Sequence, residues 1–418
     1  MHNRPIEQVM VLSGGGARGA YQVGVCKHLY STGWEPDMVL GNSIGATNGA
    51  ILVAPNYDAV QDPHVREQIE TPADLLEYVW LNHMLNLKLY TSFWPSIEPS
   101  RAVSQPPHLP LPELFDVLRD PDAHPQAFED LVDQVQQELG PEIAEFTDSV
   151  SATVTAETRA AGLPERAATR GLLKFVLGLF KGRLRLPALI PRPGWHRVLE
   201  EYVDWDRLND SEATCFGVAS TDVTTGALQM FWNHLPPGAQ GRETHIHVRH
   251  VLSSSSIPGV YPATKAEASA GEARYRWDGV LVANVPIAPA VDLIESVERV
   301  VVVLMAPWSE RPEGPGFPPS EEETPVSGQA ADEYVPTVGD ALKRHLDWWM
   351  LAPLRSELRK LTDPLQRDKV KIVWPEALAQ PGSPIDYLTN PLSIVDYRRD
   401  RNEQLIEVGR QDANNQGL

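Results

Sequence analysis

The sequence predicts an α/β fold built on a mostly parallel central sheet, and two neighbouring patterns lead to this prediction. A short apolar run at 8–12 is followed by a glycine cluster, and apolar residues at helical spacing then extend over 17–31. A second apolar run at 37–40 leads into a small-residue helical pattern at 44–53. Strand, helix, strand and helix in this order are typical of a parallel sheet whose crossovers are helices.

A long segment of different character interrupts the later elements. From 56 to 200 strand patterns are absent and helical stretches punctuated by proline follow one another, so we expect a helical insertion or cap. Strand patterns return at 215–223 and 227–232, with a turn at Thr225-Gly226 between them.

The C-terminal part completes the same domain. A strand at 300–305 precedes a segment rich in Pro, Gly and Glu at 307–330, which we interpret as an exposed loop. Residues 331–418 supply C-terminal helices and a last strand near 370–374. We therefore expect one domain over 1–418.

Composition disfavours several classes of protein. The formal net charge is −20, which disfavours non-specific binding to nucleic acid or anionic lipid. The 2 cysteines are too few for a disulfide scaffold and lack metal-ligand spacing, so we expect reduced thiols. The N-terminus lacks a signal-peptide pattern, and no apolar run is long enough to span a bilayer, so we expect a soluble protein of the cytoplasm.

The first glycines raise the alternative of dinucleotide binding. Gly14, Gly16 and Gly19 spell GxGxxG between strand and helix, but this motif requires an acidic residue at the end of the second strand. The candidate, Asp37, precedes that strand, and no Lys-Ser or Lys-Thr pair completes a Walker A motif. The context of the motif therefore disfavours a nucleotide.

The second motif is GNSIG at 41–45, a GxSxG match between the predicted strand and helix. In a nucleophile elbow the serine occupies a strained turn, and glycines stand where a Cβ would clash. Gly41 and Gly45 hold these positions, and Ser43 is the candidate nucleophile.

A serine nucleophile needs hydrogen-bond donors for the oxyanion of its tetrahedral intermediate. The successive amides of Gly14, Gly15 and Gly16, beside a helix N-terminus, are typical of an anion-binding loop. Arg18 adds a positive charge at the same place, although a structural salt bridge accounts for it almost equally well. These residues are the candidate oxyanion hole.

The candidates for a base are histidines and one aspartate. The stretch HIHVRH places His245 and His247 on one face of an expected strand, which suggests a metal site. A third ligand at suitable spacing is missing, so a solvated strand face is the preferred interpretation. Asp278, followed by a glycine at a strand end, is the better candidate.

Taken together, these motifs resemble those of the patatin-like phospholipases, which are serine lipid acyl hydrolases with a Ser-Asp dyad. The segment 14–19 matches the family's GGGxRG oxyanion motif, 41–45 its GxSxG elbow, and Asp278-Gly279 its aspartate-glycine motif. The Ser/Pro-rich block at 253–263 and Asn284-Val285-Pro286 are similar to further family motifs. The likeness covers 6–54 and about 213–306. Val280 departs from the small residue usual after Asp-Gly, and 56–200 aligns with nothing in the family core.

The resemblance implies a three-layer α/β/α hydrolase fold and cleavage of fatty-acyl esters of phospholipids or other lipids. It implies that Asp278 accepts the Ser43 proton directly, that the glycine loop binds the oxyanion, and that neither a metal nor an organic cofactor takes part. A small-ester carboxylesterase or thioesterase is the closest alternative. A dinucleotide-binding oxidoreductase and a catalytically idle lipid-binding protein are alternatives from other classes.

The segment 171–195 is locally basic and apolar, with five Lys or Arg residues among Leu, Phe, Val and Ile. This pattern suits an interfacial helix or a lid over an acyl groove. A core helix whose basic residues solvate its outer face is an equally good interpretation. The expected partner is a lipid, with peripheral membrane contact through this segment.

Overall fold

The computed structural model describes residues 5–85, 194–210, 213–236, 243–258, 261–267, 273–306, 308, 350–375 and 396–418. All of them belong to one compact unit, formed by residues 1–89 and 192–418, and residues 90–191 form a second unit. Most of the predicted insertion at 56–200, of the basic segment at 171–195 and of the loop at 307–330 lies outside the described residues.

The strands of the described chain are β1 (Gln8–Leu12), β2 (Met38–Asn42), β3 (Cys215–Asp222), β4 (Leu228–Trp232), β5 (Thr264–Glu267), β6 (Ala273–Asp278), β7 (Arg299–Val303) and β8 (Val370–Val373). They form one mixed sheet in the order β5-β6-β3-β2-β1-β7-β8, with β4 paired to β3 outside this path. The pairings of β1 with β2 and β7, of β2 with β3 and of β7 with β8 are parallel, and the remaining pairings are antiparallel. The predicted mostly parallel sheet is confirmed.

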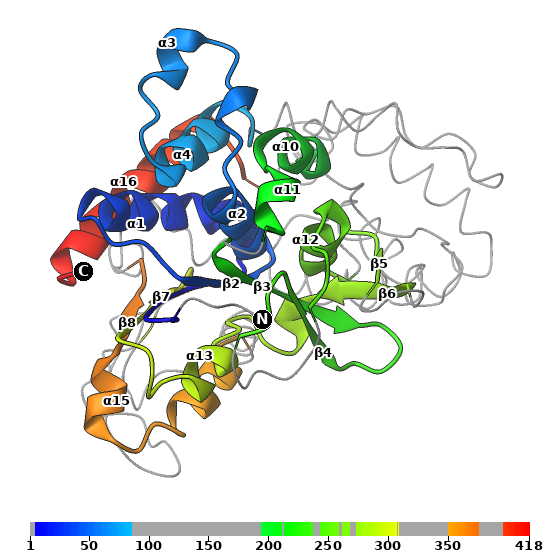
Figure 1. Ribbon diagram of the computed structural model, residues 1–418, viewed down its shortest axis with the longest axis vertical. Coiled ribbons are helices and arrows are strands. Elements are labelled where there is room, and N and C mark those ends of the chain that lie inside the picture. The colour runs from blue at the N-terminus through cyan, green and yellow to red at the C-terminus, as the bar shows by residue number, and fades with distance from the viewer. Residues whose placement is uncertain are drawn as a thin grey trace, which may run out of the picture. The chain divides into compact units, whose positions relative to one another are not determined.

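The helices of the described chain are η1 (Gly16–Gly19), α1 (Ala20–Ser31), α2 (Ile44–Val53), η2 (Tyr57–Ala59), α3 (Pro63–Arg66), α4 (Pro72–Asn82), α10 (Trp195–Tyr202), α11 (Trp205–Leu208), α12 (Val248–Ser254), η4 (Gly279–Leu281), α13 (Ala288–Asp292), α15 (Pro364–Asp368) and α16 (Arg399–Asn415). Helices α1, α2, α4 and α16 lie on one side of the sheet, and α13 and α15 lie on the other (Figure 1). This is the three-layer α/β/α arrangement that the sequence predicts.

The central strands are buried because helices cover both faces of the sheet (Figure 1). Val9, Met10, Val11 and Leu12 of β1 have no exposed surface, and β3 is buried along its whole length. Continuous apolar runs of this kind are typical of parallel strands, which do not alternate between water and core. The uninterrupted run at 8–12 therefore identifies a central strand.

Several predicted elements lie where the sequence places them. The strand at 8–12 and the helix at 44–53 are confirmed, and β3 and β4 form the expected hairpin, with Gly226 at φ 70°. The helix predicted from residue 17 begins as the 3-10 turn η1, and the α-helix starts at Ala20. The strand end predicted at Asp278 is the end of β6, whereas β5, which pairs with β6 at the edge of the sheet, was not predicted.

The strand predicted around HIHVRH is wrong, because the segment enters helix α12. His247 is the N-cap of this helix, where its Nδ1 accepts the amide of Arg249, and the His247 amide donates to Nδ1 of His250. His250 is buried, and desolvation lowers its pKa to about 4, so it is neutral. These histidines therefore close the N-terminus of a helix.

Helix α16 packs closely along α1. A Cβ on Gly24 of α1 would lie 1.9 Å from the carbonyl oxygen of Ile406, and a Cβ on Gly409 would lie 2.1 Å from that of Tyr21. Backbone contact at this distance requires glycine on each helix. The hydroxyl of Tyr21 also donates to Asp412 Oδ2 at 3.1 Å, which adds a buried hydrogen bond between the two helices.

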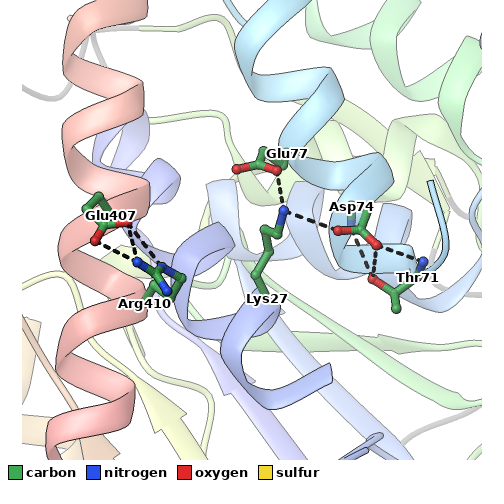
Figure 2. Close-up of polar contacts among 6 residues, drawn as sticks. All are labelled: Lys27, Thr71, Asp74, Glu77, Glu407 and Arg410. Atoms are coloured by element: carbon green, nitrogen blue, oxygen red, sulfur yellow. Dashed lines mark hydrogen bonds and ion pairs between the residues drawn. The ribbon is translucent and has the colours of Figure 1, made fainter. Parts of the chain in front are cut away.

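Helix α4 is held against α1 by a half-buried charge cluster. Lys27 of α1 pairs with Asp74 and Glu77 of α4, as Figure 2 shows, and its nitrogen lies 3.2 Å from Asp74 Oδ1. Asp74 also forms a capping box with Thr71 at the N-terminus of α4. The Asp74 carboxylate therefore caps the N-terminus of α4 and also pairs with Lys27 of α1.

Candidate active site

Ser43 lies at the carboxyl edge of the parallel strands, between the end of β2 and the start of α2. Ligands and reacting groups gather at this edge in open α/β sheets. Ser43 has φ 55° and ψ −124°, and among the described residues no other non-glycine residue has a positive φ. A serine in this conformation stores strain of the order of 1–3 kcal/mol, which the surrounding structure must offset.

The two glycines of the elbow allow backbone segments to approach closely. A Cβ on Gly41 would lie 2.5 Å from Cα of Ala46, and a Cβ on Gly45 would lie 2.3 Å from the carbonyl oxygen of Leu12. Both contacts are with backbone, which has no rotamer to move. Glycine is therefore required on each side of the serine, as the GxSxG pattern predicts.

Asp278 is the last residue of β6, and the sheet register brings it to the level of Ser43. Asn42, the residue before Ser43, is opposite Ala219 on one side of β3, and Asp278 is opposite Ser220 on the other. Asn42 is thus the last residue of β2 and Asp278 the last residue of β6, the two strands that flank β3 in this sheet, and Ser43 follows Asn42 directly. Asp278 is fully buried, and its Oδ1 accepts the Val280 amide at 2.8 Å.

Burial sets the proton affinity of this carboxylate. Desolvation raises the pKa of Asp278 to about 7, although the side chain of Ser43, the Val280 amide and the side chain of Asn42 each lower it. Among the described residues no donor reaches hydrogen-bond geometry at the second carboxylate oxygen, Oδ2. A buried carboxylate that has a pKa near neutrality, and one oxygen not engaged in a hydrogen bond, can accept a proton from a neighbouring hydroxyl.

The glycine loop lies directly against the elbow. A Cβ on Gly14 would be 3.1 Å from Cβ of Ser43, and the Gly14 amide donates to the carbonyl oxygen of Asn284 at 3.2 Å. Within the described chain the amides of Gly15 and Gly16 have no acceptor, and Gly16 has φ 59°. Two adjacent amides beside the serine can therefore receive an anion.

Arg18 is directed toward the neighbouring strand end. Its guanidinium donates to the carbonyl oxygen of Met305, just beyond β7, at 3.5 Å, and the Arg18 amide donates to the carbonyl oxygen of Gly15. The Met305 side chain lies within 3.1 Å of a Cβ built on Gly15. Arg18 thus helps to fix the loop against β7.

The sequence did not predict a chain of hydrogen-bonded polar side chains around Ser43. The Ser43 amide donates to Oγ of Ser254 at 2.7 Å, and Ser254 in turn donates to Oδ1 of Asn42 at 3.4 Å. Nδ2 of Asn42 donates to Oδ1 of Asn284 at 3.3 Å, and Asn284 contacts the Gly14 carbonyl oxygen. The chain joins the elbow to the glycine loop. Its sequence signals are the polar residue inside GNSIG, the run of serines at 253–256 and the Asn284-Val285-Pro286 motif, none of which shows that these side chains meet.

The acidic residue considered for a dinucleotide site lies at the opposite edge of the sheet. Asp37 precedes β2, and its Oδ2 accepts the amides of Glu7 and Gln8 at 3.0 and 2.8 Å. Asp37 therefore binds the main chain at the start of β1, whereas the glycine loop follows the other end of this strand. Among the described residues no group of three His, Cys, Asp or Glu is arranged to hold a metal ion.

A family model described as "Patatin-like phospholipase" matches residues 10–291. No curated protein matches the chain. Among solved structures the chain is similar to VipD from Legionella pneumophila, with 16% sequence identity and a TM-score of 0.34, covering 97% of this chain and 67% of that one. None of the helices in the described residues is long and apolar enough to cross a membrane.

Proposed function

Because the chain belongs to the patatin-like phospholipase family, we propose that it hydrolyses fatty-acyl esters of phospholipids or related lipids with a dyad of Ser43 and Asp278. The family is one of lipid acyl hydrolases, and the dyad, the oxyanion hole and the ester class are our inference for this chain. One observation carries the proposal. A strained, buried serine and a fully buried carboxylate with a pKa of about 7 flank the same strand, β3.

The first half of the reaction acylates the enzyme. Asp278 takes the proton of the Ser43 hydroxyl at Oδ2 as Oγ attacks the ester carbonyl carbon. The oxyanion accepts hydrogen bonds from the amides of Gly15 and Gly16. The carbon–oxygen bond to the alcohol then breaks, and the proton on Asp278 passes to the leaving oxygen, so that a lysolipid or alcohol departs.

The second half releases the acyl chain. Water attacks the carbonyl carbon of the acyl-serine, and Asp278 takes its proton. The same two amides hold the second oxyanion. When the bond to Ser43 Oγ breaks, the proton returns to the serine, and a fatty acid leaves. An aspartate near its usual pKa of about 3.9 is a weak base for these transfers. Burial of Asp278 brings its pKa close to the working pH, which favours proton transfer.

In this proposal two amides of the glycine loop, those of Gly15 and Gly16, donate to the oxyanion, and the amide of Gly14 does not. The Gly14 amide is already bonded to the carbonyl oxygen of Asn284. Gly14 serves instead as the place where the loop approaches Ser43 most closely, and Arg18 supports the loop through Met305. Substrate contact at 171–195, as a lid or an interfacial helix, belongs to the same proposal, as do peripheral membrane association and residence in the cytoplasm.

A fluorophosphonate probe tests the proposal, because it forms a covalent bond only with an activated serine. The wild-type chain, Ser43→Ala and Asp278→Asn are compared with Ser296→Ala, which removes an exposed serine hydroxyl that donates to the carbonyl oxygen of Leu293. We expect labelling of the wild type and of Ser296→Ala and none of the other two. Peptide mapping then locates the label, and p-nitrophenyl esters from acetyl to palmitoyl measure the chain-length preference.

The outcomes separate the alternatives. A label on Ser43 with turnover that rises with chain length supports a lipid acyl hydrolase, whereas a preference for acetyl esters indicates a small-ester carboxylesterase. Folded wild-type protein that stays unlabelled with and without detergent micelles contradicts the dyad and favours a lipid-binding protein.

A further inference from the structure

We propose that Gln22, Asn48 and Trp80 are positioning residues that hold both ends of the glycine loop in place for oxyanion binding. This inference rests on the proposed function, because the loop must donate to an oxyanion for its position to affect the rate. None of the three residues belongs to the motifs that suggested the activity. They come from three helices, α1, α2 and α4.

Two of these side chains bind the carbonyl groups at the two ends of the loop. Nε2 of Gln22 donates to the carbonyl oxygen of Ser13, just before the loop, at 2.8 Å. Nδ2 of Asn48 donates to the carbonyl oxygen of Gly19, at its end, at 3.1 Å. The segment between these anchors contains Gly15 and Gly16, whose amides are the proposed oxyanion donors. The loop is thus fastened on both sides of its functional amides.

The anchors are bonded to each other and to the neighbouring helix. Asn48 Nδ2 also donates to Oε1 of Gln22 at 2.9 Å, and the indole nitrogen of Trp80 donates to Oδ1 of Asn48 at 2.9 Å. All three side chains have no exposed surface. Each of these hydrogen bonds therefore orients the next side chain, and together they fix the orientation of the side-chain amides of Gln22 and Asn48.

A polar network of this kind is not needed for packing alone. Replacing a buried hydrogen-bonded set with apolar groups of similar shape is often neutral or stabilising, whereas a half-satisfied set is costly. Here the donors are directed at two main-chain carbonyls of one short loop. The network therefore restricts where the loop lies, which a purely apolar contact does less specifically.

Trp80 also contacts the loop directly and links it to the C-terminal segment. A Cβ on Gly19 would lie 2.9 Å from the Trp80 ring. The ring stacks on Tyr397 with centroids 5.8 Å apart, and Nδ2 of Asn402 donates to the Trp80 carbonyl oxygen at 3.2 Å. Tyr397 and Asn402 lie beyond the matched range 10–291. Residues from 396 onward therefore support the glycine loop through this tryptophan.

The test uses a variant that keeps the shape of the glutamine and removes its hydrogen bonds, Gln22→Met. The milder Trp80→Phe keeps the stacking and removes the indole N–H, so that one folded variant is available if the first does not fold. The control is Asn233→Ala, which removes another buried asparagine side chain that binds main-chain groups, at the far end of β3. Active sites are counted by burst titration, so that kcat refers to competent enzyme.

For Gln22→Met we expect kcat to fall about 10- to 100-fold with KM within about twofold, because a shift of the oxyanion donors affects the transition state more than the bound ester. Trp80→Phe gives a smaller loss of the same kind. The inhibition constant of a trifluoromethyl ketone, whose serine adduct carries an oxyanion, rises by the same factor as kcat falls. Amide hydrogen exchange at residues 14–19 becomes faster in both variants and stays unchanged in Asn233→Ala.

A merely structural network gives a different result. In that case Gln22→Met, like Asn233→Ala, lowers the melting temperature and leaves kcat per active site unchanged, which overturns the proposal. If the wild type hydrolyses no ester and Ser43 is not labelled, the proposed function fails first and the inference fails with it. An active wild type with unchanged kcat in both variants refutes the inference alone.

Discussion

Replacing Asp278 with asparagine should stabilise the protein at alkaline pH while abolishing its activity. The native state must hold an ionised carboxylate in a fully buried site above pH 7, whereas the unfolded chain holds it in water. Asparagine has the same shape and carries no charge, so it avoids this cost. Its side-chain oxygen can still accept the Val280 amide.

The pKa values set the magnitude and the sign of the effect. With a native pKa of about 7 and an unfolded value of 3.8, the native state binds more protons than the unfolded state between these pH values. The unfolding free energy of the wild type therefore falls as pH rises through this window. Relative to Asp278→Asn, we expect it to fall by roughly 2–3 kcal/mol between pH 5 and pH 8.

Urea unfolding of both proteins at half-unit steps from pH 5 to pH 8 measures this difference. All other titrating groups are common to the two proteins, so the difference isolates Asp278. In parallel, kcat/KM of the wild type should rise about tenfold per pH unit below 7 and level off above it, because the base must be ionised. Curves that run parallel over the whole range refute the perturbed pKa, and near-normal turnover of the variant refutes the dyad.

Three further predictions concern other contacts. Ser254→Ala leaves the Ser43 amide buried without its acceptor, so we expect a loss of about 1–3 kcal/mol of stability and a lower kcat. An unchanged urea midpoint and an unchanged kcat would contradict this. Gly24→Ala forces a Cβ against the backbone of α16 and should cost about 3 kcal/mol or more. The control Gly33→Ala, at φ 80° in open space, should cost only about 1–2 kcal/mol, and equal losses would argue against the tight helix contact. Lys27→Met should cost about 1 kcal/mol or less at neutral pH. That cost should disappear as pH falls through the pKa of Asp74, which is held below its usual value, and an effect that persists in acid would rule out the charge pair.

The parts of the fold that were predictable have strong local signals. The buried run at 8–12 and the small-residue helix at 44–53 each follow from a continuous pattern, and the strained serine between strand and helix follows from GNSIG. Asp278 was found by its motif and its resemblance to a family, not by periodicity. Nothing local shows that it pairs with Ser220 in the sheet.

The missed elements depend on contacts that are distant in sequence. Strand β6 (Ala273–Asp278) carries exposed Arg274 and Tyr275, and although its end at Asp278 was predicted, its pairing with β3 and β5 was not. The alternation in HIHVRH suggested a strand, but the segment begins helix α12, where His247 caps the first turn. Ser254 was not predicted as a partner of Ser43 because the two are 211 residues apart and meet only in the folded sheet.

The position of the two proposed dyad residues on opposite flanks of β3 has a consequence for biosynthesis. The nucleophile elbow, with strands β1 and β2, is made early, but strand β6 and its carboxylate leave the ribosome much later. At synthesis rates of roughly 5–20 residues per second the interval lasts roughly 10–50 s. In the proposed mechanism the nascent chain carries Ser43 without its base during this interval, so a growing or truncated polypeptide would be unable to hydrolyse an ester until β6 has paired with β3.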